Sequence, residues 1–203
     1  MRTNRCVYAC VGASNHTAED RQQEDYYATD PIAGKLLLEV ESNLNNIWEC
    51  ACGEGHLAEV FENAGKLGKV SDLIDRGYKP KNVDIEVEYG EDFTTLDVEQ
   101  NIWNGDIVTN PPYAIAEQFV RKALALTPKG RKVCMFLRTL FLEGQKRKKL
   151  FEEFPPKVIY VSSSRISCAK NGDFETYNSG AQAYSWFVWE VGYKGETIVK
   201  WIN

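Results

Sequence analysis

The sequence predicts an α/β fold, with a doubly wound, mainly parallel sheet of about seven strands in a single domain over residues 1–203. Short apolar runs rich in β-branched residues alternate along the chain with segments whose apolar residues recur every three or four positions, which indicates strands alternating with helices. The chain has 203 residues, of which 43% are hydrophobic, enough for one core and too few for two large ones. No apolar run reaches about 18 residues, so no transmembrane helix is expected.

The expected strands are apolar runs, rich in β-branched or aromatic residues, with turn residues between them. They are residues 46–51, 69–74, 83–87, 106–109, 132–137, 157–161 and 184–191, with a further candidate at 197–202. Apolar residues at helical spacing predict helices over 32–40, 56–64, 114–126 and 145–151. Segment 162–182 is polar and rich in turn residues, so no regular element is expected there. Long loops of this kind often carry function, which makes the segment a candidate recognition loop.

Charge is divided unevenly between the two halves of the chain. Residues 1–100 hold nine Lys and Arg against 20 Asp and Glu, whereas residues 101–203 hold 15 against nine. The densest basic cluster is Lys146-Arg147-Lys148-Lys149, which suits contact with a polyanion. Glu152 and Glu153 follow at helical spacing and could pair with it, so an ordinary solvated helix face is the alternative.

Six cysteines and two histidines limit the metal and redox chemistry of the chain. Cys50 and Cys52 are two residues apart and Cys134 lies in an apolar run, which favours reduced thiols over disulfides. Because no CxxC pair or histidine cluster is present, no metal site is expected. Residues 1–30 show no secretory or transit pattern, so the expected location is the cytoplasm.

A glycine turn joins a predicted strand to a predicted helix over residues 48–57, Trp-Glu-Cys-Ala-Cys-Gly-Glu-Gly-His-Leu. Gly53 and Gly55 lack the Cβ atoms that would block a close approach, and N–H groups at the helix start can face an anion. A tight structural turn would look the same. Asp72 follows about twenty residues later, at the end of the next strand, where α/β sheets place an acid that accepts from ribose hydroxyls. Together the two features indicate a nucleotide-like ligand.

Asp92 and Phe93 place another acid beside an aromatic ring. This pairing suits adenine, because the acid can accept from the exocyclic amine and the ring offers an apolar face. Asp92 could equally cap a helix or a turn.

The sequence Asn110-Pro111-Pro112-Tyr113 directly follows the apolar strand candidate 106–109. The two prolines restrict the backbone and remove its N–H donors, so they leave a stiff turn at the strand end. The Asn110 side-chain oxygen and the Pro111 carbonyl can both accept from one planar NH₂ group, and the Tyr113 ring offers a face for stacking. The motif therefore predicts a site for a planar amine carried on a ring.

With these motifs the chain resembles the class I S-adenosylmethionine-dependent DNA adenine-N6 methyltransferases of small phage and prophage type. The resemblance implies a Rossmann-like fold, S-adenosylmethionine as cofactor, DNA as partner and a bacterial host cytoplasm. Residues 1–30 would carry the N-terminal cofactor motif, around Tyr27 and Thr29, which help to hold the methionine part. The residues implied in cofactor binding are Tyr27, Thr29, Glu49, Ala51, Cys52, Gly53, Gly55, Asp72, Leu73, Asp92, Phe93 and Asn110. The implied catalytic residues are Asn110, Pro111, Pro112 and Tyr113.

The target of the transfer is the least determined part of this interpretation. Phosphate and base contacts are expected from Lys146, Arg147, Lys148, Lys149, Arg165, Lys170 and Asn171. No separate target-recognition domain is present, so a second subunit for recognition is a further expected partner. Enzymes that methylate RNA bases or a protein glutamine present the same kind of amine and are the alternatives. A catalytically idle module that binds the cofactor and needs a partner is another.

Overall fold

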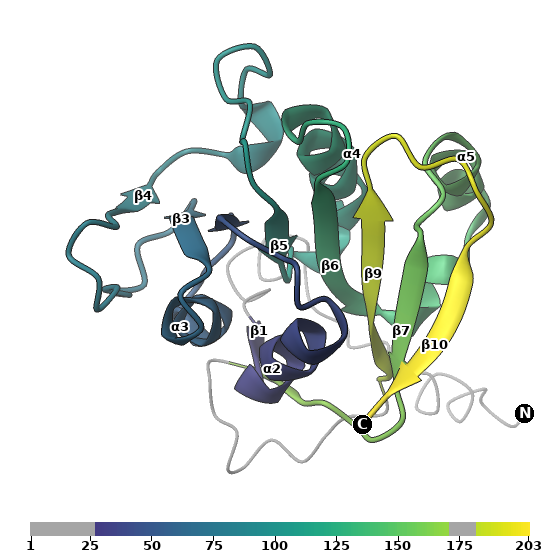
Figure 1. Cartoon of the computed structure of the whole chain (residues 1–203), viewed down its shortest axis with the longest axis horizontal. Helices are drawn as coiled ribbons and strands as arrows, with labels where there is room; N and C mark the ends of the chain where they lie inside the picture. Colours follow the sequence, from purple (N-terminus) through teal and green to yellow (C-terminus); the bar gives the residue numbers. More distant parts are fainter. Residues whose placement is uncertain (1–26, 171–181) are drawn as a thin grey trace, which may run out of the picture.

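The computed structural model describes residues 27–170 and 182–203. The strands of its main sheet are β2 (Ile47–Glu49), β3 (Leu67–Asp72), β4 (Val87–Tyr89), β5 (Ile107–Thr109), β6 (Lys132–Arg138), β7 (Val158–Ser162), β9 (Tyr184–Glu190) and β10 (Ile198–Ile202). They lie in the order β10-β7-β9-β6-β5-β2-β3-β4 (Figure 1). β9 is antiparallel to β6 and β7, and the other neighbouring pairs are parallel. The predicted α/β class with a mainly parallel sheet is confirmed.

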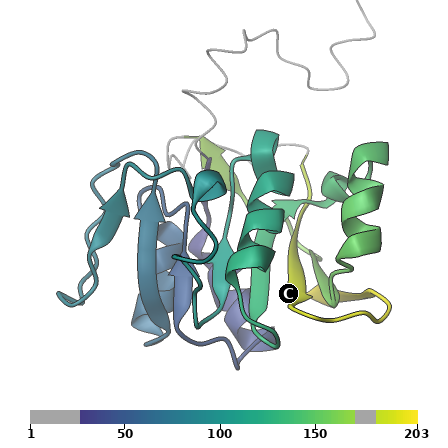
Figure 2. The ribbon, with the colours of Figure 1, turned by 90° about the horizontal axis from the view of Figure 1, so that it is seen from above.

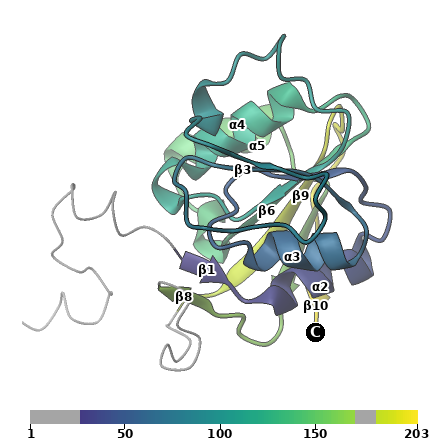
Figure 3. The same cartoon turned by 90° about the vertical axis from the view of Figure 1, so that its left-hand side faces the viewer.

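Helices cover both faces of this sheet. Helices α2 (Pro31–Val40) and α3 (His56–Asn63) lie on one face, and α4 (Ala116–Leu126) and α5 (Gln145–Glu153) on the other (Figure 3). Alternate residues of a strand point to opposite faces. Accordingly, Cys134 and Phe136 of β6 pack with α2 and α3, whereas Val133 and Met135 pack with α4. Two apolar cores therefore sandwich the sheet.

The order of the strands reverses at β2, which pairs with β3 on one side and β5 on the other. The chain leaves β2 towards α3 on one face and leaves β5 towards α4 on the opposite face. A crevice opens at the carboxyl ends of two such strands, and this is where open α/β sheets bind ligands. The predicted glycine turn and the Asn110 motif both begin here, since they directly follow β2 and β5.

Several strands differ in detail from the sequence expectation, and β2 is shorter than the expected range 46–51. The candidate at 197–202 forms β10, so the sheet has eight strands rather than about seven. β4 begins at Val87 instead of residue 83, because Asn82 accepts hydrogen bonds from the N–H groups of Asp84 and Ile85 and holds the preceding segment in a turn. β3 spans Leu67–Asp72 instead of residues 69–74. The Asp72 carboxylate accepts from the N–H of Ile74 at 2.9 Å, which turns the chain after the strand.

The expectation of no regular element in 162–182 was wrong. Cys168–Lys170 forms β8, which pairs antiparallel with β1 (Tyr27–Thr29), with Ala28 opposite Ala169. Figure 2 shows this small sheet at the edge towards which β3 and β4 point. The pairing joins segments that are far apart in the sequence. Each of the two strands has only three residues, which is too few to show a periodic pattern in the sequence. The remaining residues of the loop, 171–181, lie outside the described residues.

Two further observations concern the described residues as a whole. None of their helices has the length and apolar character needed to cross a membrane. Cys50, Cys52, Cys134 and Cys168 are buried free thiols.

Candidate active site

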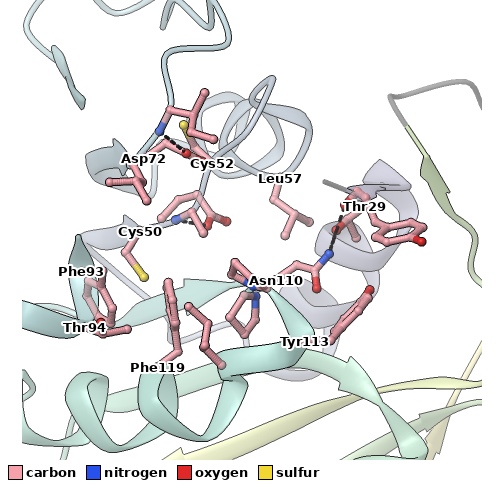
Figure 4. Close-up of a pocket in the computed structure, with 18 of the residues that line it drawn as sticks. Thr29, Cys50, Cys52, Leu57, Asp72, Phe93, Thr94, Asn110, Tyr113 and Phe119 are labelled. Carbon is pink, nitrogen blue, oxygen red and sulfur yellow. Dashed lines mark hydrogen bonds between the residues drawn. The ribbon is translucent and has the colours of Figure 1, made fainter. Parts of the chain in front are cut away.

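A cavity of about 750 Å³ lies at the point where the strand order reverses. Its walls come from β1 and from the segments after β2, β3, β4 and β5, including the 3-10 helices η1 (Phe93–Thr95), which follows β4, and η2 (Tyr113–Ile115), which follows β5 (Figure 4). The residues predicted to bind a cofactor or to catalyse all line it, except Gly53 and Gly55. These two glycines shape the loop that carries Ala51 and Cys52. The structure therefore brings the two strand-end motifs and the N-terminal motif together around one space.

Asp72 fixes the glycine loop from the neighbouring strand. One of its carboxylate oxygens accepts from the N–H of Gly53 at 2.8 Å, and the other accepts from Ile74. Gly53 and Gly55 have φ values of 56° and 88°, which side-chain-bearing residues rarely adopt. Carboxylate oxygens have additional lone pairs, so Asp72 can hold the loop and still accept from a ligand hydroxyl.

Gly55 is required for a second, steric reason. A Cβ atom at this position would lie 2.0 Å from the Tyr78 ring, which is buried beneath the loop. Gly55→Ala should lower the free energy of unfolding by about 3 kcal/mol and weaken cofactor binding, because either the loop or the ring must move. Gly65→Ala is the matched control. Gly65 has a similar positive φ of 65° but open space around it, so it should cost only about 1–2 kcal/mol.

Chemical denaturation of the two variants measures this difference. Equal losses of stability would mean that backbone strain alone explains the glycine at position 55 and that Tyr78 gives way freely.

Glu49 is a buried carboxyl group at the cavity wall, only 1% exposed. One oxygen accepts from the N–H of Ala51 at 3.2 Å, and Oε2 has no hydrogen-bond partner among the described residues. Burial raises the pKa of Glu49 to about 8. An acid in this condition is neutral at pH 7 unless a cationic ligand stabilises its charge.

Phe93 and Asp92 form another part of the cavity wall. Phe93 is buried and stacks on Phe119 of α4, with the ring centroids 5.0 Å apart. The Asp92 carboxylate accepts from the N–H and the hydroxyl of Thr94, so it caps η1. The capping alternative is therefore correct, and a contact between Asp92 and adenine stays a prediction. Leu73 and Ile74 complete an apolar wall, with 56% and 45% of their surfaces exposed.

Asn110 has a fixed orientation. Its amide Nδ2 donates to the Thr29 hydroxyl oxygen at 2.7 Å and to the Tyr27 carbonyl at 3.3 Å (Figure 4). Because a carbonyl can only accept, the NH₂ group must face β1 and the oxygen Oδ1 must face away. Oδ1 is buried without a hydrogen-bond partner among the described residues. Asn110, which lines the cavity and directly precedes Pro111, thus keeps an unused acceptor.

Thr29 is a positioning residue for Asn110 in this geometry, in addition to lining the cavity. Thr29→Val removes the hydroxyl without changing the volume, whereas Thr29→Ser keeps it. We expect Thr29→Val to lower the rate constant of the methyl transfer that the resemblance implies, by about tenfold to a hundredfold. Thr29→Ser should restore most of it, because an Asn110 amide that is not held in place aligns poorly with the substrate amine. Calorimetry with S-adenosylhomocysteine should give nearly equal affinities for the two variants. A rate that is equal in Val and Ser variants would exclude the positioning role.

Tyr113 is enclosed by other aromatic rings. Its ring centroid lies 6.0 Å from that of Tyr27 and 5.9 Å from that of Tyr184. The Arg138 guanidinium carbon lies 4.6 Å from the same centroid, a cation–π contact. Burial raises the pKa of Tyr113 well above its ordinary value, so the residue stays protonated at neutral pH. It offers a ring face rather than a base.

The predicted nucleic-acid residues that the structure describes do not line the cavity. Lys148 and Lys149 of α5 are exposed and face Glu152 and Glu153 at 3.5 and 3.7 Å, as the alternative interpretation expects for a solvated helix face. Four of the other five residues are described by the structure and fall in different places. Arg147 donates to the Glu143 carbonyl, Lys146 is exposed, Arg165 is exposed in the segment after β7, and Lys170 lies opposite Tyr27 in β8. Asn171 lies outside the described residues.

Several residues of the site were missed from the sequence. Tyr78, Phe119 and Tyr184 read as ordinary core aromatics, because nothing in their local pattern shows which loop or ring they contact. Arg138 was one basic residue in a basic half of the chain. The available signal was its position at the end of the strand that follows the Asn110 motif, the edge where ligands bind.

No family model and no curated protein matches the sequence. Among solved structures, the chain is similar to a candidate class I S-adenosylmethionine-dependent methyltransferase from Listeria monocytogenes, with TM-score 0.55 and 13% identity over 84% of this chain and 62% of that one. A candidate hemolysin from Lactococcus lactis gives TM-score 0.58 and 10% identity over 81% and 89% of the two chains. The modification subunit of a candidate type I restriction enzyme from Vibrio vulnificus gives TM-score 0.57 and 13% identity over 88% and 47%.

The chain spans less than two thirds of the length of the Listeria and Vibrio proteins. At identities this low, the similarity concerns the fold, and one fold can serve several functions. The mainly parallel sheet with helices on both faces and these neighbours agree with the predicted doubly wound α/β fold. The chain has the Rossmann-like α/β fold of the class I methyltransferases.

Proposed function

We propose that this protein transfers a methyl group from S-adenosylmethionine to the exocyclic N6 amine of adenine in DNA. The orientation of Asn110 carries the proposal, because its NH₂ group is held by Tyr27 and Thr29 and its buried Oδ1 has no partner among the described residues. An unsatisfied buried acceptor costs free energy, so a donor from a ligand is expected there. A planar NH₂ group can donate one hydrogen to Oδ1 and the other to the Pro111 carbonyl.

The cavity wall suits the proposed cofactor. S-adenosylmethionine, when bound, supplies an activated methyl group on a positively charged sulfur, and it also carries an ammonium group. The buried Glu49 carboxyl with its unpartnered Oε2 is the acid that would accept a cationic group. Asp72 would accept from the ribose hydroxyls. Leu73 and Ile74 expose apolar surface where the cofactor's adenine can pack.

The residues of the motif would act mainly by positioning. With both N6 hydrogens held by Asn110 and Pro111, the nitrogen lone pair is drawn out of conjugation with the ring and aimed in a fixed direction. The lone pair then forms the bond to the methyl carbon as the bond from that carbon to sulfur breaks, and one N6 hydrogen leaves as a proton to water. Tyr113 stacks on the base as a neutral ring. No strong base is needed.

Two observations favour a nucleic acid over a protein as the substrate. The basic excess lies in residues 101–203, and exposed lysines of α5 supply positive charge for phosphate contacts. The choice of DNA over RNA is supported by the resemblance of the sequence motifs to DNA adenine-N6 methyltransferases and by the similarity to a modification subunit of a candidate restriction enzyme. An adenine inside a duplex cannot reach such a cavity, so the base would be flipped out or taken from a single strand. The proposal extends to a protein encoded by a phage or prophage, which acts in the bacterial cytoplasm and uses a second subunit to recognise the target sequence.

The test offers three substrates in parallel. The purified protein is incubated with labelled S-adenosylmethionine and unmethylated DNA, RNA or protein, and the products are digested and identified by mass spectrometry. N6-methyladenine in DNA alone supports the proposal. Label only in RNA or in a protein glutamine would replace it with one of those activities. Cofactor binding without any transfer would favour an idle or partner-dependent module.

A further inference from the structure

Arg138 lies beside the Asn110 motif because β6 is longer than β5. Thr109, the last residue of β5, is opposite Met135, and β6 continues three residues further to Arg138. Its partner on the other side is Tyr184, the first residue of β9. The overhang of β6 brings the guanidinium over the Tyr113 ring, 4.6 Å from its centroid. The proposed catalytic motif therefore has a cation next to it that does not itself line the cavity.

Among the described residues, phenol rings lie next to this guanidinium. Burial acts to lower the pKa of Arg138, but Tyr184, Tyr113 and Tyr27 raise it above its ordinary value. The ion pairs found within residues 27–170 and 182–203 do not include Arg138. Its Nε atom is buried without a hydrogen-bond partner among the described residues. A half-buried cation with an unused donor is costly unless an anion completes its environment.

We propose that Arg138 binds a backbone phosphate of the nucleic acid next to the target base, an inference that rests on the proposed function. A guanidinium can keep one face on an aromatic ring while the N–H groups in its plane bind phosphate oxygens. Tyr113 would then stack on the base while Arg138, in contact with the same ring, holds the adjoining phosphate. The flipped nucleotide is held at both its base and its backbone.

The carboxylate of the cofactor is the other source of an anion near this site. The position of Arg138 argues against it, since the arginine is not among the residues that line the cavity. Arg138 also overhangs the motif on the side of β9, away from the glycine loop after β2, because β5 and β6 separate β9 from β2 in the sheet. A phosphate that follows the base towards the rim of the cavity fits this placement better.

The test measures how binding to an oligonucleotide depends on salt. Fluorescent single-stranded and duplex oligonucleotides containing adenine are titrated with the full chain, with S-adenosylhomocysteine present, between about 50 and about 200 mM salt. Arg138→Gln should weaken binding about tenfold at low salt and reduce the slope of log affinity against log salt by about 0.9 on duplex or about 0.7 on a single strand. Arg138→Lys should keep the slope, because it keeps the charge.

Arg131→Gln is the matched control, since Arg131 directly precedes the opposite end of the same strand. It should leave both slope and affinity unchanged, and thermal unfolding should show all variants folded. A slope that is unchanged in Arg138→Gln, or reduced equally in Arg131→Gln, overturns the phosphate assignment. Loss of S-adenosylhomocysteine affinity with an unchanged slope would assign Arg138 to the cofactor carboxylate instead.

Failure of the phosphate assignment can be distinguished from failure of the proposed function. If the wild type binds the oligonucleotides and Arg138→Gln changes the slope, but no methyl group is transferred to DNA, the phosphate site stands and the proposed reaction fails. If the wild type transfers methyl groups to DNA while Arg138→Gln keeps the full slope, the reaction stands and the phosphate site fails.

Discussion

Replacement of Asn110 by alanine should lower the rate of methyl transfer by a factor of about 10² to 10³ and leave the affinity for S-adenosylhomocysteine within about twofold. The variant removes the buried acceptor Oδ1, which has no partner among the described residues. It also removes the amide that β1 holds through Tyr27 and Thr29. The loss therefore falls on alignment of the amine rather than on the cofactor. Single-turnover transfer and calorimetry measure the two quantities separately.

Two further variants sharpen this test. Asn110→Asp keeps an acceptor oxygen but loses the donors to Tyr27 and Thr29, so it should retain more activity than alanine. Asn101→Ala is the control, since Asn101 donates to a backbone carbonyl outside the cavity and its loss should leave the transfer rate unchanged. Equal losses of rate and cofactor affinity in Asn110→Ala would mean that Asn110 serves the fold or the cofactor site only.

Cofactor affinity should rise with pH in the wild type and should not do so in Glu49→Gln. The pKa of Glu49 is raised to about 8 by burial, so the carboxyl must lose its proton before it can pair with a cationic cofactor. The affinity for S-adenosylhomocysteine, which keeps the ammonium group, should increase by up to about tenfold per pH unit between about pH 6 and about pH 8 and then level off. Glu49→Gln cannot ionise, so its affinity should be lower at pH 8 and nearly independent of pH.

The stability of the ligand-free protein should show the opposite trend. Between the ordinary pKa of 4.5 and the raised value of about 8, the unfolded state loses the Glu49 proton while the folded state keeps it. The folded state binds more protons there, so this residue reduces stability as pH rises, by a few kcal/mol at most. Glu49→Gln should therefore gain stability relative to the wild type from about pH 6 to about pH 8. Parallel pH profiles for the two proteins, in binding or in unfolding, would contradict the assignment.

The predictable part of the fold is the part with a local signal. Alternating apolar runs and helical spacing locate the strands of the main sheet and the four helices that cover it, because each of these patterns extends over several residues. β1 and β8 pair across most of the chain and have three residues each, so no local period indicates them. The turn at Asn82 delays β4 through side-chain hydrogen bonding that a count of apolar residues does not register.

The candidate site also has one part that local sequence signals predict and another part that they do not. The glycine turn, Asp72 and the Asn110 motif are each a local signal at the end of a strand, so their meeting at one cavity could be predicted. The orientation of the Asn110 amide depends on β1, and the contact of Arg138 with Tyr113 depends on the overhang of β6. Both arise from pairing between distant segments. For Asp92 the sequence left two roles open, and the structure shows the cap.

The most direct test of the central claim is the identity of the nucleoside methylated by the wild type and by Asn110→Ala on one duplex of DNA. Both proteins are incubated with labelled S-adenosylmethionine, and the DNA is digested to nucleosides and analysed by mass spectrometry. The account predicts N6-methyl-2′-deoxyadenosine from the wild type and almost none from the variant, with S-adenosylhomocysteine bound equally by both. Label in another nucleoside, or equal label from the two proteins, would contradict it.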